Sequence, residues 1–510
     1  MSRNGCAVVA TGHELVSQAA AQILEAGGNA FDAAVAAGFA GAVAEQTLTS
    51  LGGGGFLLAR TAGMEGPCEE IFFDFFVNTP GLGRNLVEEP HFFPVTVNFG
   101  GSVQEFNIGL GSVAVPGTLK GLLHVQERLG RMPLRDVVEP AIRLARGHRL
   151  NDFQAGFLRL LHPIMTMSAT GRALYEPGGR YRKPGDILKN PAMADFLEVL
   201  PEDRGREFYE GEIAREMVRD MEAEQGLLTM EDLKQYQVRE RKPLRIRYRD
   251  YTLLTGPPPS LGGTLIGLSL AILEKLDVPE QWGSGPHLLQ TFALMQEVER
   301  LRDLGIASPE ALQQFRESGE VTGSAETIRS FSRGTTHISV ADGQGNIASM
   351  TCSNGEGSGY FAPHTGIMLN NMMGEDDLHP EGFHASPPGI RVSSMMAPSA
   401  LLRENRVELV LGSGGSKRIR TAMTQVLSQY IDFRRDIHSA VHAPRLHWDG
   451  SRIQVEPGFS PEAVDLLRSR AEVNVWDELN VYFGGVHTVV PGREGVGDPR
   501  RGGAVAVVEL

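Results

Sequence analysis

Residues 331–353 read FSRGTTHISVADGQGNIASMTCS, and this stretch indicates the fold more clearly than any other part of the chain. Polar and apolar residues alternate on both sides of Asp342-Gly343-Gln344-Gly345-Asn346. Gly and Asn tolerate positive φ, so this segment is typical of the turn of a β-hairpin. The pattern predicts a hairpin that is symmetric about Gln344.

The symmetric register sorts the hairpin into two faces, because side chains alternate along a strand and a one-residue slip would mix them. The largely apolar face pairs Ile338 with Met350, Val340 with Ala348 and Thr336 with Cys352. The polar face pairs Thr335 with Ser353, His337 with Thr351 and Ser339 with Ser349.

Thr335 therefore begins a strand with the hydroxyl of Ser353 opposite it. Cleavage between Gly334 and Thr335 would make Thr335 a candidate nucleophile, whereas without cleavage the two residues would be ordinary cross-strand partners. His337 lies two residues along the same face, and a structural role is expected for it.

The composition is that of an ordinary globular protein. The chain has 510 residues, of which 41% are hydrophobic and 22% are charged, with a formal net charge of -14. Its basic residues are scattered along the sequence, so neither nucleic acid nor an anionic membrane is an expected partner.

The three cysteines, Cys6, Cys68 and Cys352, predict neither a disulfide framework nor a metal cluster. Cys352 falls on the apolar face of the hairpin and is expected in the core. The first 20 residues lack the apolar run of a secretory signal, and no uninterrupted apolar stretch is long enough to span a bilayer. We expect a soluble, cytoplasmic protein without a metal or an organic cofactor.

Elements before the hairpin follow from periodicity and stop signals. CAVVATG (residues 6–12) predicts a strand, residues 13–26 and 29–45 predict helices, and the second helix is so rich in Ala that it must pack closely against a neighbour. The four glycines of residues 52–55 lack the lysine and hydroxyl of a phosphate-binding loop, which favours close backbone packing instead. Residues 318–334 are small and polar, and they predict an exposed, mobile segment that ends at Thr335.

Eight blocks of sequence, spread in order along nearly the whole chain, are the most specific signals that it carries. They are AAAQILEAGGNAFDAAVAAGFAGAVAEQTLTSLGGGGFLLAR (19–60), GSVAVPGTLKGLLHVQERLGRMPL (111–134), GPPPSLGG (256–263), GTTHISVADGQGNIASMT (334–351), TGIMLNN (365–371), RVSSMMAPS (391–399), GSGGSKRI (412–419) and HAPRLHW (442–448). In these blocks the chain resembles the gamma-glutamyltranspeptidases, which are N-terminal nucleophile hydrolases.

The resemblance implies an α+β fold, a four-layer αββα sandwich of the N-terminal nucleophile hydrolase type. It also implies a proenzyme that cuts itself before Thr335 into a large subunit (residues 1–334) and a small subunit (residues 335–510), which together form one intertwined domain. The implied substrate is a small-molecule gamma-glutamyl amide such as glutathione. The subunits would be each other's partners, and assembly into a homo-oligomer is left open.

The resemblance also carries roles onto individual residues. Thr335 would be the nucleophile, with its freed α-amine as the base, and Ser353 matches a threonine that orients the nucleophile's hydroxyl. Gly414 and Gly415 match the pair whose backbone N–H groups hold the oxyanion, although a Gly-Gly pair alone usually marks a turn.

Ser393 and Ser394 match a serine pair that binds the carboxylate end of the glutamyl group. Without the resemblance, they would be interpreted as exposed loop serines.

Three departures from the family pattern concern the substrate pocket. The arginine that clamps the substrate α-carboxylate is replaced by Phe76, which is not a small change, and Arg84 is the nearest arginine that could substitute for it. The asparagine of the family's TxN segment is shifted or lost at Asn354. The acid that binds the α-amine aligns with Glu375 without a gap, or with Asp376 or Asp377 after a short insertion.

Three hypotheses follow. The first is a gamma-glutamyl transferase or hydrolase. The second is a related amidohydrolase that takes another acyl group, as in the cephalosporin acylases. Phe76 in place of arginine favours this second hypothesis, because it makes the pocket less cationic. The third is a non-catalytic member that keeps the fold.

Overall fold

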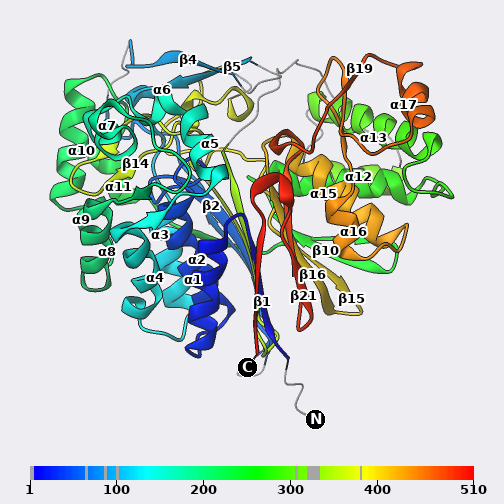
Figure 1. The fold of residues 1–510 in the computed structure, drawn as a ribbon, viewed down its shortest axis with the longest axis horizontal. Helices are drawn as coiled ribbons and strands as arrows, with labels where there is room; N and C mark the ends of the chain where they lie inside the picture. The colour runs from blue at the N-terminus through cyan, green and yellow to red at the C-terminus, as the bar shows by residue number, and fades with distance from the viewer. Residues whose placement is uncertain are drawn as a thin grey trace.

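Two β-sheets lie face to face in the middle of the protein, and helices cover both outer faces (Figure 1). The structure is a computed structural model that describes residues 5–63, 67–84, 89–98, 103–304, 308–318, 334–379 and 382–509. The arrangement confirms the expected four-layer αββα sandwich. Most of the segment expected to be exposed and mobile, residues 319–333, lies outside the described residues.

The first sheet has seven strands in the order β22-β1-β11-β12-β2-β3-β8, and all neighbours are antiparallel. The strands are β22 (Ala504–Val508), β1 (Ala7–Thr11), β11 (Thr336–Ala341), β12 (Ile347–Ser353), β2 (Gly54–Arg60), β3 (Glu70–Phe75) and β8 (Arg239–Arg241). Strands from before and after Thr335 therefore pair with each other within one sheet, as β1 does with β11 and β12 does with β2.

The second sheet has six strands in the order β21-β20-β16-β15-β10-β9. They are β21 (Glu494–Val496), β20 (Gly485–Val490), β16 (Arg406–Gly414), β15 (Ser399–Arg403), β10 (Tyr251–Thr255) and β9 (Leu244–Tyr248). Strands β16 and β20 pack against β11, β12 and β1 of the first sheet. The hairpin β11–β12 consequently lies in the centre of the sandwich.

The predicted register of the hairpin is confirmed at every pair from Thr336–Cys352 to Ala341–Ile347. Its apolar face belongs to the core beneath the first helix layer. Its polar face is buried between the two sheets, where the Ser339 hydroxyl donates to the His487 carbonyl at 3.1 Å. Polar side chains are tolerated there because the backbone of the second sheet accepts their hydrogen bonds.

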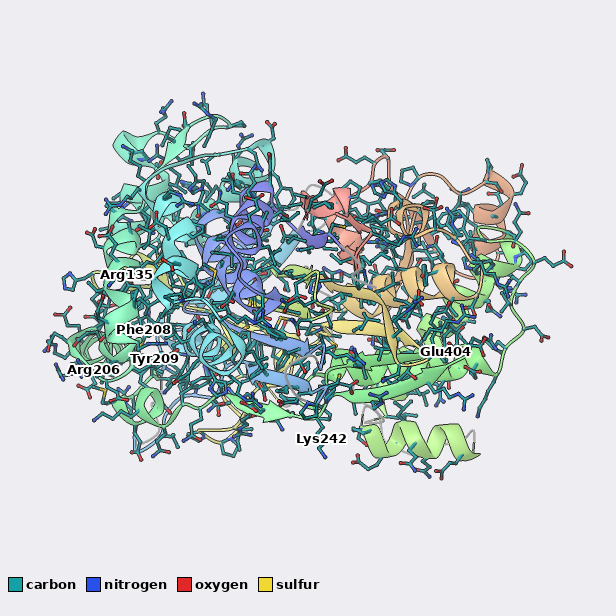
Figure 2. The ribbon with its side chains drawn as sticks, turned by 90° about the horizontal axis from the view of Figure 1, so that it is seen from below. Arg135, Arg206, Phe208, Tyr209, Lys242 and Glu404 are labelled. Carbon is teal, nitrogen blue, oxygen red and sulfur yellow. The ribbon has the colours of Figure 1, made fainter. Side chains whose placement is uncertain are left out.

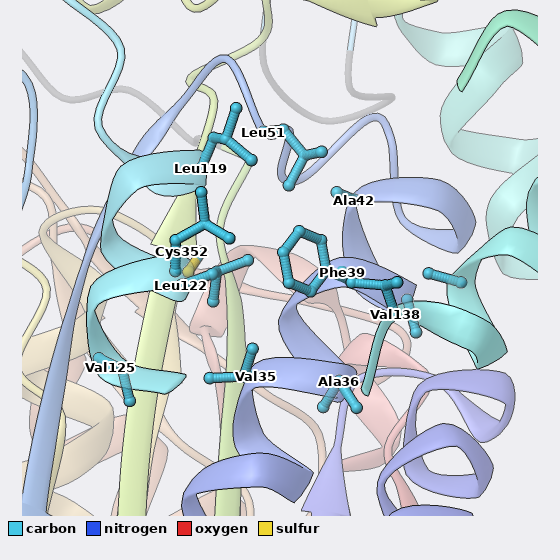
Figure 3. Close-up of a cluster of buried hydrophobic side chains, with 14 of the residues drawn as sticks. Val35, Ala36, Phe39, Ala42, Leu51, Leu119, Leu122, Val125, Val138 and Cys352 are labelled. Carbon is cyan, nitrogen blue, oxygen red and sulfur yellow. The ribbon is translucent and has the colours of Figure 1, made fainter. Parts of the chain in front are cut away.

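The first helix layer consists of α1 (Glu14–Glu25), α2 (Ala30–Ala44), α3 (Thr118–Leu129) and α4 (Leu134–Arg146). Asn29 caps α2, and every residue of this helix is buried, as its Ala-rich sequence predicts. A Cβ on Gly38 would lie 2.6 Å from a methyl group of Leu122, so glycine lets α3 approach α2 closely. Figure 3 shows part of the resulting core, which contains Cys352 as predicted, together with Leu122 and Phe39.

The second helix layer consists of α12 (Leu261–Glu274), α13 (Gly285–Asp303), α15 (Arg418–Ile431) and α16 (Ile437–His442). Helices α12 and α15 pack against β9, β16 and β20, and their apolar side chains join a core that continues between the sheets. The glycine run predicted to pack closely does so, since a Cβ on Gly53 would lie 2.3 Å from the Ser353 carbonyl oxygen.

Smaller elements surround the sandwich. They are β4 (Phe93–Asn98), β5 (Val103–Ile108), β6 (His148–Arg149), α5 (Asp152–Leu160), α6 (His162–Met165), α7 (Ala169–Tyr175), β7 (Ile187–Leu188), α8 (Pro191–Asp203), α9 (Arg206–Tyr209), α10 (Glu212–Ala223), α11 (Met230–Gln235), α14 (Pro309–Ser318), β13 (Phe361–Ala362), β14 (Ile367–Met368), β17 (Leu446–Trp448), β18 (Ile453–Val455), α17 (Pro461–Arg468), β19 (Val473–Val475) and the 3-10 turns η1 (Leu110–Ser112), η2 (Pro177–Gly179), η3 (Met372–Gly374), η4 (Asp376–Leu378), η5 (Val481–Phe483) and η6 (Pro499–Arg501). Among the residues described, no helix has the length and apolar character needed to cross a membrane.

Candidate active site

Thr335 lies immediately before β11, buried between the two sheets. Its hydroxyl is 3.5 Å from the hydroxyl oxygen of Ser353, the last residue of β12. The structure thus brings together the two residues that the symmetric register pairs. The hairpin positions them because β11 begins and β12 ends at its open end, opposite the turn.

A chain of hydrogen bonds links Thr335 to the peptide bond that precedes it. The Thr335 hydroxyl donates to Ser353 Oγ, and the Ser353 hydroxyl donates to the Gly334 carbonyl at 2.6 Å. The N–H of Gly355 donates to Ser353 Oγ at 3.1 Å and fixes that oxygen from the other side. The carbonyl of the predicted cleavage bond is therefore polarised by a hydroxyl group that also contacts the candidate nucleophile.

The carbonyl of Thr335 itself is held by Arg501, a residue that the sequence analysis did not single out. Arg501 Nη1 donates to this oxygen at 3.0 Å. Burial lowers the pKa of the Arg501 guanidinium to about 10. No local pattern in GDPRRGG distinguishes Arg501 from a surface arginine, because Arg501 lies in η6 and reaches the hairpin only through tertiary structure, including the pairing of β22 with β1.

Glu45, also missed in the sequence, lies at the end of α2 and contacts Thr336, the residue after the candidate nucleophile. The Thr336 hydroxyl lies 3.1 and 3.0 Å from its two carboxyl oxygens. Burial raises the pKa of Glu45 to about 7, while the Thr336 hydrogen bond and the Arg501 charge act in the opposite direction. A buried acid in this state binds its proton more tightly in the folded protein than in the unfolded chain.

This raised pKa predicts a stability that depends on pH. Unfolding lets Glu45 lose its proton above its ordinary pKa of 4.5, whereas the folded protein keeps the proton until about pH 7. The free energy of unfolding should therefore fall as pH rises across this window. Glu45→Gln cannot ionise, and it should be more stable than the parent at pH 8 by up to about 3 kcal/mol, with no such gain at pH 4.5.

Urea unfolding at both pH values measures this effect. Glu25→Gln, at the exposed end of α1, is the matched control. It should change the free energy of unfolding only slightly, and by the same amount at both pH values. A Glu45→Gln variant with the same pH dependence as the parent would show that this carboxyl group is ionised throughout the range.

Gly414 is the last residue of β16, Gly415 follows it, and Gly414 contacts the backbone of Thr335. A Cβ on Gly414 would lie 2.4 Å from the Thr335 carbonyl oxygen, so only glycine fits there. Gly415 has a φ of 126°, which side chains rarely adopt. Gly414 thus lies against the candidate nucleophile, whereas Gly415 lies against Gly484 and Arg501, and the role of the pair as oxyanion donors stays a prediction.

A cavity of about 30 Å³ opens beside Thr335. Its lining combines polar groups with a mostly apolar wall. The lining residues are Phe76, Thr335, Ser353, Met372, Glu375, Leu378, Ser394, Met395, Met396, Ser416 and Ile419. Five positions singled out in the sequence (Phe76, Thr335, Ser353, Glu375 and Ser394) therefore meet in one cavity.

The other residues assigned to substrate binding lie outside this lining. Ser393 lines a neighbouring cavity of about 220 Å³, and Leu378 is shared by the two cavities. The side chain of Asn354 is buried, and its Oδ1 atom has no hydrogen-bond partner among the described residues. Asp376 lies in the turn η4 and does not line the cavity, so Glu375 is the acid that the described side chains bring to Thr335.

Phe76 occupies the cavity wall, and the described residues that line this cavity include no lysine or arginine. Its ring lies 5.5 Å from that of Phe56. The buried Arg391 is behind Phe76, donates to its carbonyl and lies 3.2 Å from an oxygen of Asp74, so its guanidinium is already bound. Arg84 donates to the Gly226 carbonyl at 2.5 Å and is not part of the lining.

His337 is fully buried and contacts other residues of the hairpin. Its Nδ1 atom lies 2.7 Å from the Thr351 hydroxyl and its Nε2 atom 2.9 Å from the Ser339 hydroxyl. Burial holds the pKa of His337 well below its usual range. Both ring nitrogens are occupied away from Thr335, in agreement with the structural role expected for this histidine.

Known proteins resemble this chain over nearly its full length. The gamma-glutamyltranspeptidase family model matches residues 16–508. A glutathione hydrolase proenzyme of Escherichia coli is 31% identical, with 97% of this chain and 90% of that protein covered. An acylase ACY 1 proenzyme of a Pseudomonas strain is 34% identical, with 90% and 85% covered. The crystal structure of a cephalosporin acylase from Bacillus halodurans matches with a TM-score of 0.83 at 26% identity, covering 98% of this chain and 96% of the other.

Proposed function

The chain belongs to the gamma-glutamyltranspeptidase family, and on this basis we propose that it cuts itself between Gly334 and Thr335 and then transfers or hydrolyses gamma-glutamyl groups. Acyl transfer or amide hydrolysis is the chemistry of the family's named members. The proposal assigns residues 1–334 to a large subunit and residues 335–510 to a small one. It is carried by one observation: Thr335, Ser353, Glu375 and Ser394 share a cavity.

Self-cleavage would follow the hydrogen-bond chain at Gly334. Thr335 Oγ attacks the Gly334 carbonyl carbon, its proton passes to Ser353 Oγ, and the Ser353 proton passes to the carbonyl oxygen. The C–N bond then breaks as the hydroxyl group of the tetrahedral intermediate gives its proton to the nitrogen and re-forms the carbonyl, and an ester joins Gly334 to Thr335. Water hydrolyses this ester, leaving a carboxyl group on Gly334 and a free α-amine on Thr335.

Position 334 can accept only glycine in this geometry. A Cβ there would lie 2.5 Å from the Gly355 carbonyl oxygen and 2.7 Å from that of Thr47. Gly334→Ala must shift the scissile carbonyl away from Ser353, and we expect self-cleavage to slow at least about tenfold. Denaturing electrophoresis over time measures the cut fraction.

The matched control is Gly156→Ala, since a Cβ at this helical position meets nothing within 4 Å. It should be cut at the parental rate. Once cut, the Gly334→Ala protein should also have the parental kcat, because residue 334 leaves the nucleophile on cleavage. Cleavage of Gly334→Ala at the parental rate would contradict the assigned geometry.

Turnover would use the groups that cleavage frees. The α-amine of Thr335, with a reference pKa of about 7.7–8.0, is partly neutral at pH 7 and can take the hydroxyl proton. The hydroxyl oxygen then attacks the substrate amide carbonyl, and the departing amine leaves an acyl-enzyme that water or a second amine resolves. Gly414 and Gly415 would donate to the oxyanion, since fixed backbone donors stabilise charge as it develops.

Two lining residues favour a gamma-glutamyl group as the acyl donor. The Glu375 carboxyl group can bind an α-ammonium group, and the Ser394 hydroxyl can donate to an α-carboxylate. Both face the same cavity as Thr335, which is the geometry required for one substrate that carries both charges.

A second candidate is an amidohydrolase with a less polar acyl group. Phe76 stands where the family has its carboxylate-binding arginine, and Met372, Met395, Met396 and Ile419 extend the apolar wall. Methionines adapt to irregular apolar ligands. The likeness to a cephalosporin acylase over nearly the whole chain supports this alternative.

Glu375→Gln separates the two candidates. For gamma-glutamyl-p-nitroanilide, loss of the carboxylate should raise KM at least about tenfold with a smaller effect on kcat. For glutaryl-p-nitroanilide, which lacks the α-amine, KM should be unchanged. Asp376→Asn, outside the cavity lining, is the control.

If the parent hydrolyses only the glutaryl compound, the acylase candidate replaces the gamma-glutamyl one. Inactivity of the fully cut protein on both anilides and on an aromatic acyl anilide would favour the non-catalytic hypothesis.

A further inference from the structure

A second cavity, of about 590 Å³, lies away from the candidate active site at one end of the second sheet. It is formed by the β9–β10 turn, the end of β15 and the residues that follow α15. Its lining includes Arg249, Tyr251, Arg403, Tyr430, Arg434 and Arg435. Its volume lies within the range of small-molecule binding sites.

The gathering of arginines is unusual in a chain whose formal net charge is -14. Four arginines line the cavity, together with Asp250 and Asp432. Two of the arginines are used by the fold. Arg249 lies 3.3 Å from Asp432 and donates to carbonyls at the end of α12, and the guanidinium of Arg435 lies 4.1 Å from the ring centre of Trp282.

The other two arginines, Arg403 and Arg434, are exposed, and their guanidinium groups have no hydrogen-bond or ion-pair partner in the described part of the chain. Arg403 lies over the ring of Tyr251 at 5.5 Å, which holds its guanidinium at the cavity wall. The rings of Tyr251 and Tyr430 are 6.4 Å apart, and neither hydroxyl has a hydrogen-bond partner within the described residues. Two cations and two phenol donors thus surround the same space.

The backbone at two of the four arginines has an uncommon conformation. In the described part of the chain, nine non-glycine residues have positive φ, and Arg249 and Arg434 are two of them, at 50° and 51°. A residue with a Cβ adopts this conformation only where its surroundings hold it there, and such positions gather at binding sites. Here the strained backbone turns both side chains to one cavity.

We propose that this cavity binds a small oxyanion that carries at least two negative charges, a phosphate ester or a polycarboxylate. Four arginines against two aspartates leave an excess of two positive charges at the cavity. Planar guanidinium groups bind phosphate and carboxylate with paired hydrogen bonds. Outside the lining, Glu408 and Arg493 act on Tyr430 with opposite charges, so together they leave this excess unchanged. The cavity shares no lining residue with the candidate active site, so the proposal is independent of the proposed function.

Isothermal titration of the full-length protein with pyrophosphate and with citrate tests the proposal. We expect saturable binding at one site, with Kd raised at least about tenfold when Arg403→Gln and Arg434→Gln are combined. The matched control combines Arg135→Gln with Arg206→Gln, whose side chains are 74% and 73% exposed. Figure 2 shows these two arginines on the half of the molecule opposite Glu404, the neighbour of Arg403.

Binding of one anion alone identifies the chemical class, and binding of both identifies a site selective for charge. Absence of heat with both anions overturns the proposal. An equal loss of affinity in the two double variants also overturns it, because the binding would then follow the overall charge rather than the cavity. Unchanged melting temperatures show that both double variants are folded.

Discussion

Thr335→Ala is expected to leave the chain uncut and to lower the rate of amide hydrolysis at least about 10³-fold. The alanine keeps the backbone and the Arg501 hydrogen bond to residue 335, but it removes the hydroxyl that attacks in both reactions. The Ser353 hydroxyl retains its partner, the Gly334 carbonyl, so little structural change is expected. Denaturing electrophoresis, N-terminal sequencing of the fragments and an anilide assay measure the two losses.

Thr335→Ser is the matched control, because it keeps a hydroxyl group while removing one methyl. It should be cut at the same bond, more slowly than the parent, and should keep measurable turnover. A Thr335→Ala protein that is still cut between residues 334 and 335 would exclude this threonine as the nucleophile of self-cleavage. If it were uncut but still active, cleavage and turnover would use different groups.

Local pattern was sufficient to predict the central hairpin. Its register depends on a side-chain period of two and on the Asp342–Asn346 turn, and both are properties of neighbouring residues. The same holds for α2, whose Asn29 cap and Ala-rich run mark its bounds and its burial. The four-layer arrangement came from the family resemblance, since strand order in a sheet depends on contacts between residues far apart in the chain.

The residues of the candidate site also fall into those indicated by local pattern and those indicated only by the family resemblance. Thr335 and Ser353 follow from the hairpin, and Glu375 and Ser394 from the ordered blocks. Nothing local could separate Ser394, which lines the cavity, from Ser393, which lines the next one. Consecutive residues in extended backbone point in opposite directions, so an alignment of the pair does not say which one faces the substrate.

Arg501 and Glu45 were missed for a related reason. They come from opposite ends of the chain, and only tertiary packing brings Arg501 to Thr335 and Glu45 to Thr336. A sequence pattern presents a lone acid or arginine as a surface residue, because such groups are rarely buried without partners. The partners here are backbone and hydroxyl groups of the hairpin, which no charge pattern reveals.

The position of Arg501 depends on a buried ion network next to it. Asp498 accepts from Arg445 at 2.6 Å and from Arg500 at 3.1 Å. Arg500 also pairs with Glu456 at 2.6 Å, and all four side chains are almost completely buried. Asp498 further accepts from backbone N–H groups of Val486 and Arg500, so it ties η6 to β20.

Asp498→Ala is expected to destabilise the fold by about 3–5 kcal/mol, because it leaves Arg445 and Arg500 buried with one carboxylate between them. Urea unfolding in the Thr335→Ala background measures this loss on a single uncut chain. The control, Asp465→Ala, breaks an exposed ion pair with Arg468 and should change stability by about 0.5 kcal/mol or less. With Thr335 restored, Asp498→Ala should also slow self-cleavage, since η6 carries Arg501 to the Thr335 carbonyl. Equal stability of the two aspartate variants would show that water replaces the missing carboxylate, and normal cleavage would show that Arg501 keeps its position without it.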